Sequence, residues 1–217
     1  MTTFQILRSL LSALGDNERI GDVVVLKSAL SNQRASPALE ARLADVRGYH
    51  PRLDLDALAA LPAGTFGYEF SRFMRSNELS PITVTGNLPE SMVADNAFMV
   101  RYGIIHDMVH VLTGFDTTWP GEAGVWAFIS AQGYSRTFSA AGYAALLFAP
   151  LISPLQVGRA WRCWKRGREL GRAAELLLPL RLEELLERSL EEVREALGIT
   201  GAGDGYLRAE ERALLAG

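Results

Sequence analysis

Residue types that carry most metal and redox chemistry are scarce in this sequence of 217 residues, which contains 1 Cys and 3 His. A single Cys cannot form a disulfide within the chain, which fits a reducing compartment. Cys163 lies between Trp161 and Trp164, and we expect it to pack rather than to act as a nucleophile. The sequence also has no P-loop, no Gly-x-Ser-x-Gly elbow and no Cys-x-x-Cys pair, so three common kinds of site are excluded.

Positive charge is not in excess either. Lys and Arg number 22 and Asp and Glu 25, and the net charge of -3 argues against a general nucleic-acid binder. The composition, 48% hydrophobic and 22% charged, is that of a globular protein. The first fifteen residues contain one charge, Arg8, and no small-residue cleavage site follows them, so we expect no signal peptide and a cytoplasmic location.

Helical spacing of apolar residues dominates the chain. It predicts helices over residues 4–14, from Ser36 to about Val46 with the Ser36 side chain as cap, over 91–113 ending at Gly114, and over 182–197. Residues 23–26 fit a short strand or a helix. Residues 80–89 are bounded by Pro and read as a loop. After a break at residues 61–65, Phe66, Phe70, Phe73 and Met74 form a stripe that is more typical of a core than of a cofactor site.

Residues 137–158 contain no charge over 22 positions. That length permits a membrane span, but Pro150 and Pro154 favour a buried or ligand-lining helix that is interrupted near its end. The basic segment, residues 159–172, follows at once with six positive charges, one negative charge and two Trp. It fits either the surface of an anionic membrane or an ordinary solvated helix face.

A small group of polar residues is harder to explain by packing. His106, Asp107 and His110 form a His-Asp-x-x-His sequence, and Glu122 follows after eleven residues. Residues four apart share one helix face, so the two imidazoles can bind one ion. Asp107 can lean toward the same point, and Glu122 returns on a second helix after a turn at Pro120-Gly121. The spacing predicts a site for Zn²⁺ or a similar divalent ion, with a hydrogen-bonded histidine pair as the alternative.

Two other residues bear on this site. Tyr102 lies one helical turn before His106, where it can manage a proton or form a hydrogen bond in the core. The third histidine, His50, precedes a Pro and reads as a loop residue.

The motif and its surroundings resemble the Coq4 family of ubiquinone-biosynthesis proteins, whose signature is His-Asp-x-x-His and then, after eleven intervening residues, Glu. Leu61-Pro62 through Gly67, Phe148-Ala149-Pro150 and Ser189 to Ile199 look like further family segments, so the resemblance covers about residues 55–200. Trp126, Ile129 and Phe70 depart from the family pattern, which makes the chain a divergent member.

The resemblance implies an all-α fold: one helical bundle over residues 1–200 with a metal site between two consecutive helices and an apolar prenyl-binding groove, and a tail over 201–217. It also implies bound zinc, peripheral association with the inner face of a membrane, and partnership with other quinone-biosynthesis proteins. A homodimer is left open.

The implied activity is removal of the C1 carboxylate of a polyprenylated 4-hydroxybenzoate ring, with or without hydroxylation at that carbon. The candidate catalytic residues are His106, Asp107, His110, Glu122 and Tyr102. The first alternative is a non-catalytic scaffold that binds prenyl lipids and organises quinone-pathway enzymes. The second is a metal phosphohydrolase of the helical His-Asp class, which needs a further upstream His.

Overall fold

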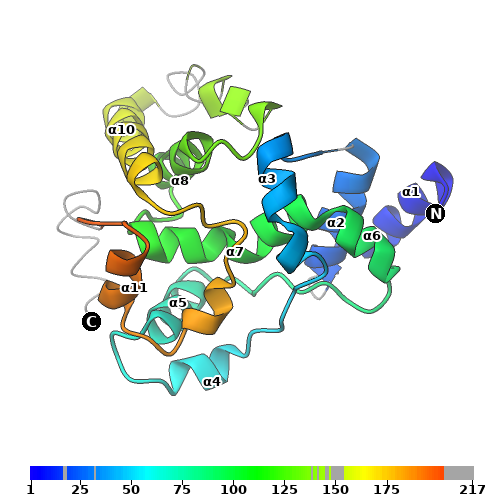
Figure 1. Cartoon of the computed structure of the whole chain (residues 1–217), viewed down its shortest axis with the longest axis horizontal. Helices are drawn as coiled ribbons and strands as arrows, with labels where there is room; N and C mark the ends of the chain where they lie inside the picture. The colour runs from blue at the N-terminus through cyan, green and yellow to red at the C-terminus, as the bar shows by residue number, and fades with distance from the viewer. Residues whose placement is uncertain are drawn as a thin grey trace.

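The fold consists of helices joined by loops (Figure 1). The computed structural model describes residues 1–16, 19–31, 33–137, 139–140, 142–144, 147 and 154–202. In these ranges no β-strand is present, and one isolated bridge pairs Thr65 with Ser189, so the predicted all-α fold is confirmed. The described helices are α1 (Thr3–Ala13), α2 (Ile20–Ser31), α3 (Pro37–Arg42), α4 (Leu55–Ala59), α5 (Phe66–Ser76), α6 (Glu90–Asp95), α7 (Ala97–Thr113), α8 (Trp119–Ala131), α10 (Val157–Ala173) and α11 (Leu190–Ala196), with 3-10 turns η2 (Ala44–Val46), η3 (Pro154–Gln156) and η4 (Leu182–Leu185).

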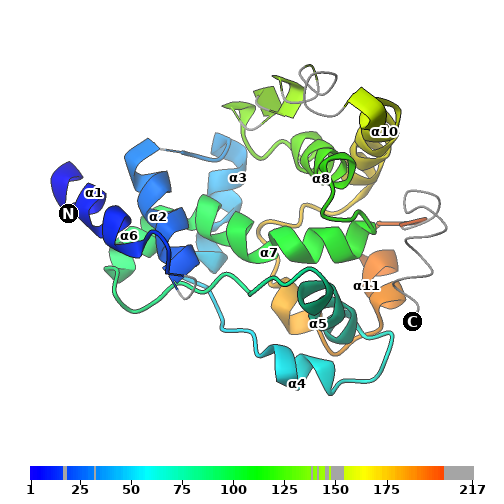
Figure 2. The same cartoon turned by 180° about the vertical axis from the view of Figure 1, so that it is seen from behind.

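Helix α7 runs through the middle of the molecule in both views, with α8 and α10 on one side and α5 and α11 on the other (Figures 1 and 2). Helices α2, α5, α6 and α8 contact it directly. Most of its residues are buried, on every side of the helix. The His-Asp-x-x-His sequence therefore lies on the central helix of the core.

The N-terminal end of α7 differs from the prediction. The expected helix over residues 91–113 is broken at Asn96, which lies between α6 and α7 with φ -108° and ψ 27°. The Asn96 side chain donates a hydrogen bond to the Met92 carbonyl oxygen at 2.8 Å, which satisfies the end of α6. At the other end, Gly114 has φ 74° and its N–H donates to the His110 carbonyl oxygen, so the predicted glycine cap is confirmed.

The predicted helix over residues 182–197 is also wrong in its continuity, because η4 and α11 are separate elements. The Ser189 hydroxyl accepts a hydrogen bond from the Glu192 N–H at 3.3 Å and starts α11 anew. Leu182, Leu186 and Val193 are buried on both sides of this break. The apolar spacing therefore continues where the helix does not.

Other local predictions are resolved by contacts outside the segment. Residues 23–26 are helical, within α2. Ser36 does begin α3, but its carbonyl oxygen, not its side chain, accepts hydrogen bonds from Leu39 and Glu40. Residues 80–89 form the predicted loop, which is held to α2 because buried Asp22 accepts hydrogen bonds from the Thr85 N–H and hydroxyl at 2.8 and 2.7 Å.

A buried ion pair connects α7 to the C-terminal part of the chain. The Arg101 guanidinium is fully buried and donates to both carboxylate oxygens of Glu183 at 2.6 and 3.1 Å. It also donates to the Leu180 carbonyl oxygen at 2.7 Å. A charge this far from water must be paired and hydrogen-bonded, and here Glu183 pairs it and both terminal nitrogens donate hydrogen bonds.

Helices α8 and α10 pack closely because small residues face one another. A Cβ atom on Gly167 would lie 2.0 Å from the Gly124 carbonyl oxygen. Cys163 and Trp164, on the same side of α10, are 1% and 2% exposed, so the predicted packing role of Cys163 is confirmed. Trp161, one helical turn before Trp164, is 54% exposed. The two tryptophans of the basic segment therefore have different surroundings.

Ten of the 22 residues of the uncharged stretch 137–158 fall outside the described residues, as does most of the tail over 201–217. Among the described residues of the stretch, Tyr143, Leu147 and Leu155 are exposed, which differs from the buried helix that was expected. The predicted prenyl-binding groove relies on that stretch and stays a prediction. Among the residues that the structure describes, no helix is both long enough and apolar enough to cross a bilayer.

Candidate metal centre

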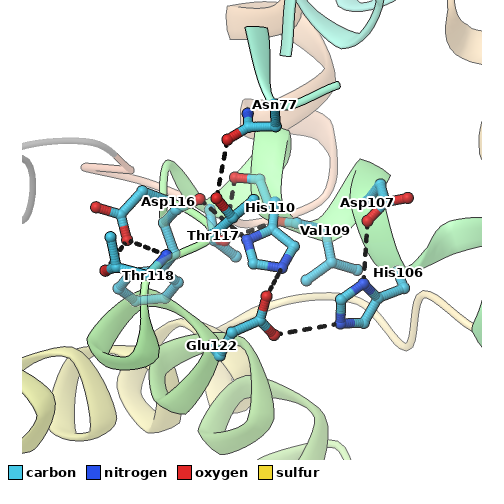
Figure 3. A network of polar contacts seen from close by, with 11 residues as sticks. Asn77, His106, Asp107, Val109, His110, Asp116, Thr117, Thr118 and Glu122 are labelled. Carbon is cyan, nitrogen blue, oxygen red and sulfur yellow. Dashed lines mark hydrogen bonds and ion pairs between the residues drawn. The ribbon is translucent and has the colours of Figure 1, made fainter. Parts of the chain in front are cut away.

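Helices α7 and α8 bring His106, His110 and Glu122 together (Figure 3). The two histidines lie one turn apart on α7, and their ring centroids are 4.9 Å apart. Glu122 projects from the first turn of α8. Pro120 and Gly121 belong to that first turn, so the prediction that they form a separate turn before Glu122 is wrong.

Both histidines direct the same ring nitrogen toward Glu122. His106 Nε2 lies 3.6 Å from Glu122 Oε2, and His110 Nε2 lies 3.3 Å from Glu122 Oε1. One ligand atom from each of the three residues lies within 4.8 Å of the others. An ion of the size of Zn²⁺, with ligand distances of about 2.0–2.2 Å, requires only small shifts of such a group.

The other nitrogen of each ring, Nδ1, forms a hydrogen bond on the side of the ring that faces away from Glu122. His110 Nδ1 is 3.1 Å from the Phe115 carbonyl oxygen, which can only accept a hydrogen bond, so Nδ1 carries the proton. His106 Nδ1 is 3.1 Å from Asp107 Oδ1 in the same way. A histidine that donates through Nδ1 presents the lone pair of Nε2, which is the usual arrangement of a metal ligand.

His110 Nε2 gives an independent indication of a metal ligand. It is buried and has no hydrogen-bond partner among the described residues, although it lies close to Glu122. A buried polar atom without a partner needs a physical explanation, and a bound cation supplies one. Two imidazole nitrogens and one carboxylate fit a divalent ion and leave a further coordination position open.

Asp107 lies beside His106 but outside this group of three. Its carboxylate approaches the ring from the nitrogen that faces away from Glu122 (Figure 3). In this arrangement Asp107 fixes the orientation of the His106 ring. Its role as a fourth metal ligand stays a prediction.

The charged groups of the centre stabilise one another. Burial alone would lower the pKa of His106, but hydrogen bonds to Asp107 and Glu122 outweigh it and raise the pKa to about 9. Burial would raise the pKa of Glu122, whereas its contacts with His106 and His110 lower it to about 2. Glu122 is therefore ionised and ready to bind a cation at neutral pH.

Tyr102 adjoins the centre, as its position one turn before His106 predicted. Its ring meets the His106 ring edge to face, with centroids 5.5 Å apart. Burial, reinforced by the negative charges of Glu122 and Asp107, raises the pKa of the Tyr102 phenol above its usual range. The phenol therefore keeps its proton at neutral pH and can donate it.

Several residues that shape the centre were not singled out as site residues in the sequence. Phe73, expected in the core, stacks on the His110 ring with centroids 5.5 Å apart. A cavity of about 290 Å³ lies between α5, the end of α7 and α11. Of His106, His110 and Glu122, which together form the metal group, His110 lines this cavity. The aromatic spacing on α5 predicted burial for Phe73, but no sequence signal indicates that its partner is a histidine.

The loop that joins α7 to α8 was likewise not recognised. Asp116 in this loop accepts hydrogen bonds from Thr118 and forms an ion pair with Arg159 of α10. Forty-three positions separate Asp116 and Arg159, so no local pattern indicates their contact. His50 is not part of the metal group, which leaves the phosphohydrolase alternative without its additional histidine.

Comparison with known proteins identifies the family. The model of a family described as "Coenzyme Q (ubiquinone) biosynthesis protein Coq4" matches residues 26–202. The chain belongs to the Coq4 family. The family match begins well before residue 55, where the resemblance in the sequence first becomes evident.

Among curated Coq4 relatives, the mitochondrial ubiquinone biosynthesis protein COQ4 homolog of Homo sapiens is 34% identical over 158 residues, which cover 68% of this chain and 55% of that protein. The Danio rerio homolog is 35% identical over 153 residues, with coverages of 68% and 54%. The mitochondrial COQ4 protein of Eremothecium gossypii is 31% identical over 171 residues, with coverages of 75% and 50%. The matched region thus spans about half the length of these relatives.

The same fold occurs in a solved structure. A crystal structure of a putative ubiquinone biosynthesis protein from Nostoc punctiforme superposes with a TM-score of 0.63 and 24% sequence identity, covering 92% of this chain and 95% of that one. The Coq4 chain therefore has the fold of that protein across nearly its whole length.

Proposed function

We propose that this Coq4 protein binds one divalent ion through His106, His110 and Glu122 and removes the C1 carboxylate from a polyprenylated 4-hydroxybenzoate-type ring during ubiquinone biosynthesis. The observation that carries the proposal is the orientation of the two imidazoles. Both present Nε2 to Glu122 while Nδ1 is held by another group. Zinc is the proposed ion, because two imidazoles and a carboxylate are ligands that it prefers.

Three protein ligands suit a catalytic site better than a structural one, which is usually closed by four. A bound divalent ion would polarise carboxylate or phenolate oxygens of the substrate and stabilise negative charge. The protein residues have separate tasks. His106 and His110 would hold the ion and thereby fix the position of the polar end of the substrate. Asp107 keeps the His106 imidazole oriented. If Asp107 also binds the ion, as predicted, the site loses one open position.

Tyr102 is the proposed proton donor. When the carbon–carbon bond to the carboxylate breaks, carbon dioxide leaves and the electron pair stays on C1 of the ring. The Tyr102 phenol, which retains its proton, can transfer it to that carbon and regain one from solvent. In the oxidative form dioxygen and a two-electron donor are co-reactants, and the products are the phenol, carbon dioxide and water.

The substrate's long tail links the proposed reaction to a membrane surface. We propose that the protein associates peripherally with the membrane through the exposed side of α10, where Trp161, Arg162 and Lys165 lie. A tryptophan among cations suits the head-group region of a bilayer. The single-domain organisation over residues 1–200, an apolar groove along 137–158 for the tail, and contacts with other quinone-biosynthesis proteins complete the proposal.

The decisive experiment follows the carboxyl carbon. Zinc-loaded protein is incubated with a 3-polyprenyl-4-hydroxybenzoate labelled in the carboxyl group, with and without dioxygen and a reductant. We expect release of labelled carbon dioxide, strongly reduced in Glu122→Gln and unchanged in the surface control Glu191→Gln. If the protein binds the lipid tightly but releases no labelled carbon dioxide under any redox condition, the scaffold alternative replaces the proposed enzymatic function.

A further inference from the structure

The loop of residues 114–118, which joins α7 to α8, forms hydrogen bonds with two members of the metal group, His110 and Glu122. The Phe115 carbonyl oxygen accepts the hydrogen bond from His110 Nδ1 at 3.1 Å. Thr118 precedes α8, and its carbonyl oxygen accepts the Glu122 N–H at 2.9 Å. The conformation of this loop therefore determines where His110 and Glu122 lie relative to one another.

Asp116 holds the loop in shape. Its Oδ1 accepts hydrogen bonds from the Thr118 N–H at 3.1 Å and the Thr118 hydroxyl at 2.5 Å. Its Oδ2 accepts from the Arg159 guanidinium at 2.5 Å, and a second nitrogen of Arg159 donates to the Thr118 hydroxyl at 3.3 Å. The side chains of Arg159 and Asp116 are only 11% and 19% exposed, so water weakens this charge-assisted contact little.

The backbone of Asp116 packs so closely against Gly121 of α8 that no side chain fits at position 121. A Cβ atom on Gly121 would lie 2.0 Å from the Asp116 carbonyl oxygen and 2.3 Å from its Oδ1. The loop is thus folded directly onto the first turn of α8, one residue before Glu122. Figure 3 shows Asp116 and Thr118 at this end of α8, on the same side of the site as His110.

We propose that Asp116 and Arg159 are positioning residues of the metal centre: their ion pair fixes residues 114–118 and thereby sets the spacing between His110 and Glu122. The proposal rests on the proposed metal binding. Neither side chain belongs to the metal group, yet Arg159 lets α10 control the geometry of a site formed by α7 and α8. A hydrogen bond to a metal ligand, such as that of the Phe115 carbonyl oxygen to His110, changes metal affinity by about 10–100-fold. Asp116 and Arg159 act one step further from the ion, so the lower end of that range is expected for them.

Cobalt(II) is the probe for the test, because its visible absorption reports the coordination geometry as well as occupancy. The full chain, Asp116→Asn and Arg159→Gln are titrated with Co²⁺ against a chelator. Asn at position 116 keeps an oxygen for Thr118 but loses the charge that Arg159 contacts. We expect about tenfold weaker binding in each variant and altered band intensities, since the ligands are displaced.

The control is Asp56→Asn, which removes the exposed ion pair between Asp56 and Arg75 away from the site. It should leave cobalt affinity and spectrum unchanged. Arg159→Lys keeps the positive charge but loses the fork that contacts both Asp116 and Thr118, so an intermediate affinity is expected even if the other variants unfold. The unfolding midpoint of each metal-free variant separates loss of stability from loss of geometry.

Wild-type affinity and an unchanged spectrum in all three site variants would overturn the positioning role and leave the metal centre intact. An equal loss in Asp56→Asn would also overturn it. If the wild-type chain itself binds no cobalt, the metal centre fails and the positioning role fails with it.

Discussion

The protonation and orientation of each imidazole in the centre depend on the oxygen atom next to its Nδ1. A backbone oxygen holds His110, whereas a carboxylate holds His106. The carbonyl of Phe115 has a fixed place in the loop, but the Asp107 side chain can rotate and can be replaced. The two histidines should therefore respond differently to substitution and to pH.

His110 is expected to be indispensable for metal binding. In His110→Ala the buried Nε2 is lost, and His106 with Glu122 cannot hold the ion tightly. We expect metal content after purification to fall from about one ion per chain to near zero, measured by elemental analysis. His50→Ala, which removes the histidine outside the group, is the control and should retain full content. Retention of metal by His110→Ala would contradict the assignment.

Metal affinity should rise with pH because of His106. Its pKa of about 9 in the metal-free protein means that an ion must displace a proton at neutral pH, whereas Glu122, with a pKa of about 2, is already ionised. Below pH 9 we expect about a tenfold gain in affinity per pH unit, levelling off above it. Chelator competition across this range measures the slope.

Replacement of Asp107 provides the matched comparison for that slope. The carboxylate helps to keep His106 protonated, so Asp107→Asn should lower the pKa of His106 and move the levelling to lower pH. Levelling at the same pH in both proteins would show that a group other than His106 releases the proton.

At the scale of elements, the contact between α8 and α10 supports the site, because α8 carries Glu122 and α10 carries Arg159. Gly167→Ala would place a methyl group against the Gly124 carbonyl oxygen and force the two helices apart. We expect a loss of about 1–3 kcal/mol in the free energy of unfolding, measured by denaturant titration.

Gly158→Ala on the same helix is the control for that substitution. The nearest atom to its Cβ is the end of a flexible Arg162 side chain at 3.7 Å, so stability should be unchanged or slightly higher. Equal effects at both positions would indicate that helix propensity, rather than close packing, determines the change in the free energy of unfolding.

Several elements were predictable from the sequence because their causes are local. Apolar spacing located α1, α5 and the C-terminal end of α7. The His-Asp-x-x-His spacing with Glu122 identified His106, His110 and Glu122, which the structure brings together as a group that could hold a metal ion. The breaks at Asn96 and Ser189 were missed because polar side chains end or restart a helix without disturbing the apolar pattern.

The remaining features depend on residues that are distant in the chain. The stacking of Phe73 on His110, the contact of Arg159 with Asp116 and the burial of Arg101 all depend on how helices pack. A single sequence contains no signal for contacts between residues that are this far apart in the chain.

At the scale of the whole molecule, the exposed side of α10 is expected to hold the protein on anionic membranes. Positive charges attract anionic lipid and the attraction is screened by salt, whereas an inserted tryptophan is less sensitive to salt. In liposome flotation, Lys165→Gln should weaken binding mainly at low salt and Trp161→Ala at all salt concentrations.

Arg8→Gln, on α1 at the opposite end of the molecule (Figure 1), is the control and should bind like the wild type. Binding that ignores both salt and lipid charge would contradict a role for the α10 cations. Many cations of the basic segment are already engaged, such as Arg159 with Asp116 and Arg166 with the Thr200 carbonyl oxygen, so the effect of each exposed cation is expected to be modest.

The ion pair between Arg101 and Glu183 has a consequence for the order of events during synthesis. Arg101 lies on the helix that bears both histidines, and the carboxylate that neutralises its buried charge in the described part of the chain is that of Glu183, which the ribosome adds 82 positions later. Until Glu183 has emerged, the central helix cannot be enclosed without an unpaired charge in its interior, which is strongly unfavourable. The two histidines are thus synthesised well before the carboxylate that neutralises Arg101, and during that interval the apolar surface of the central helix is exposed to aggregation.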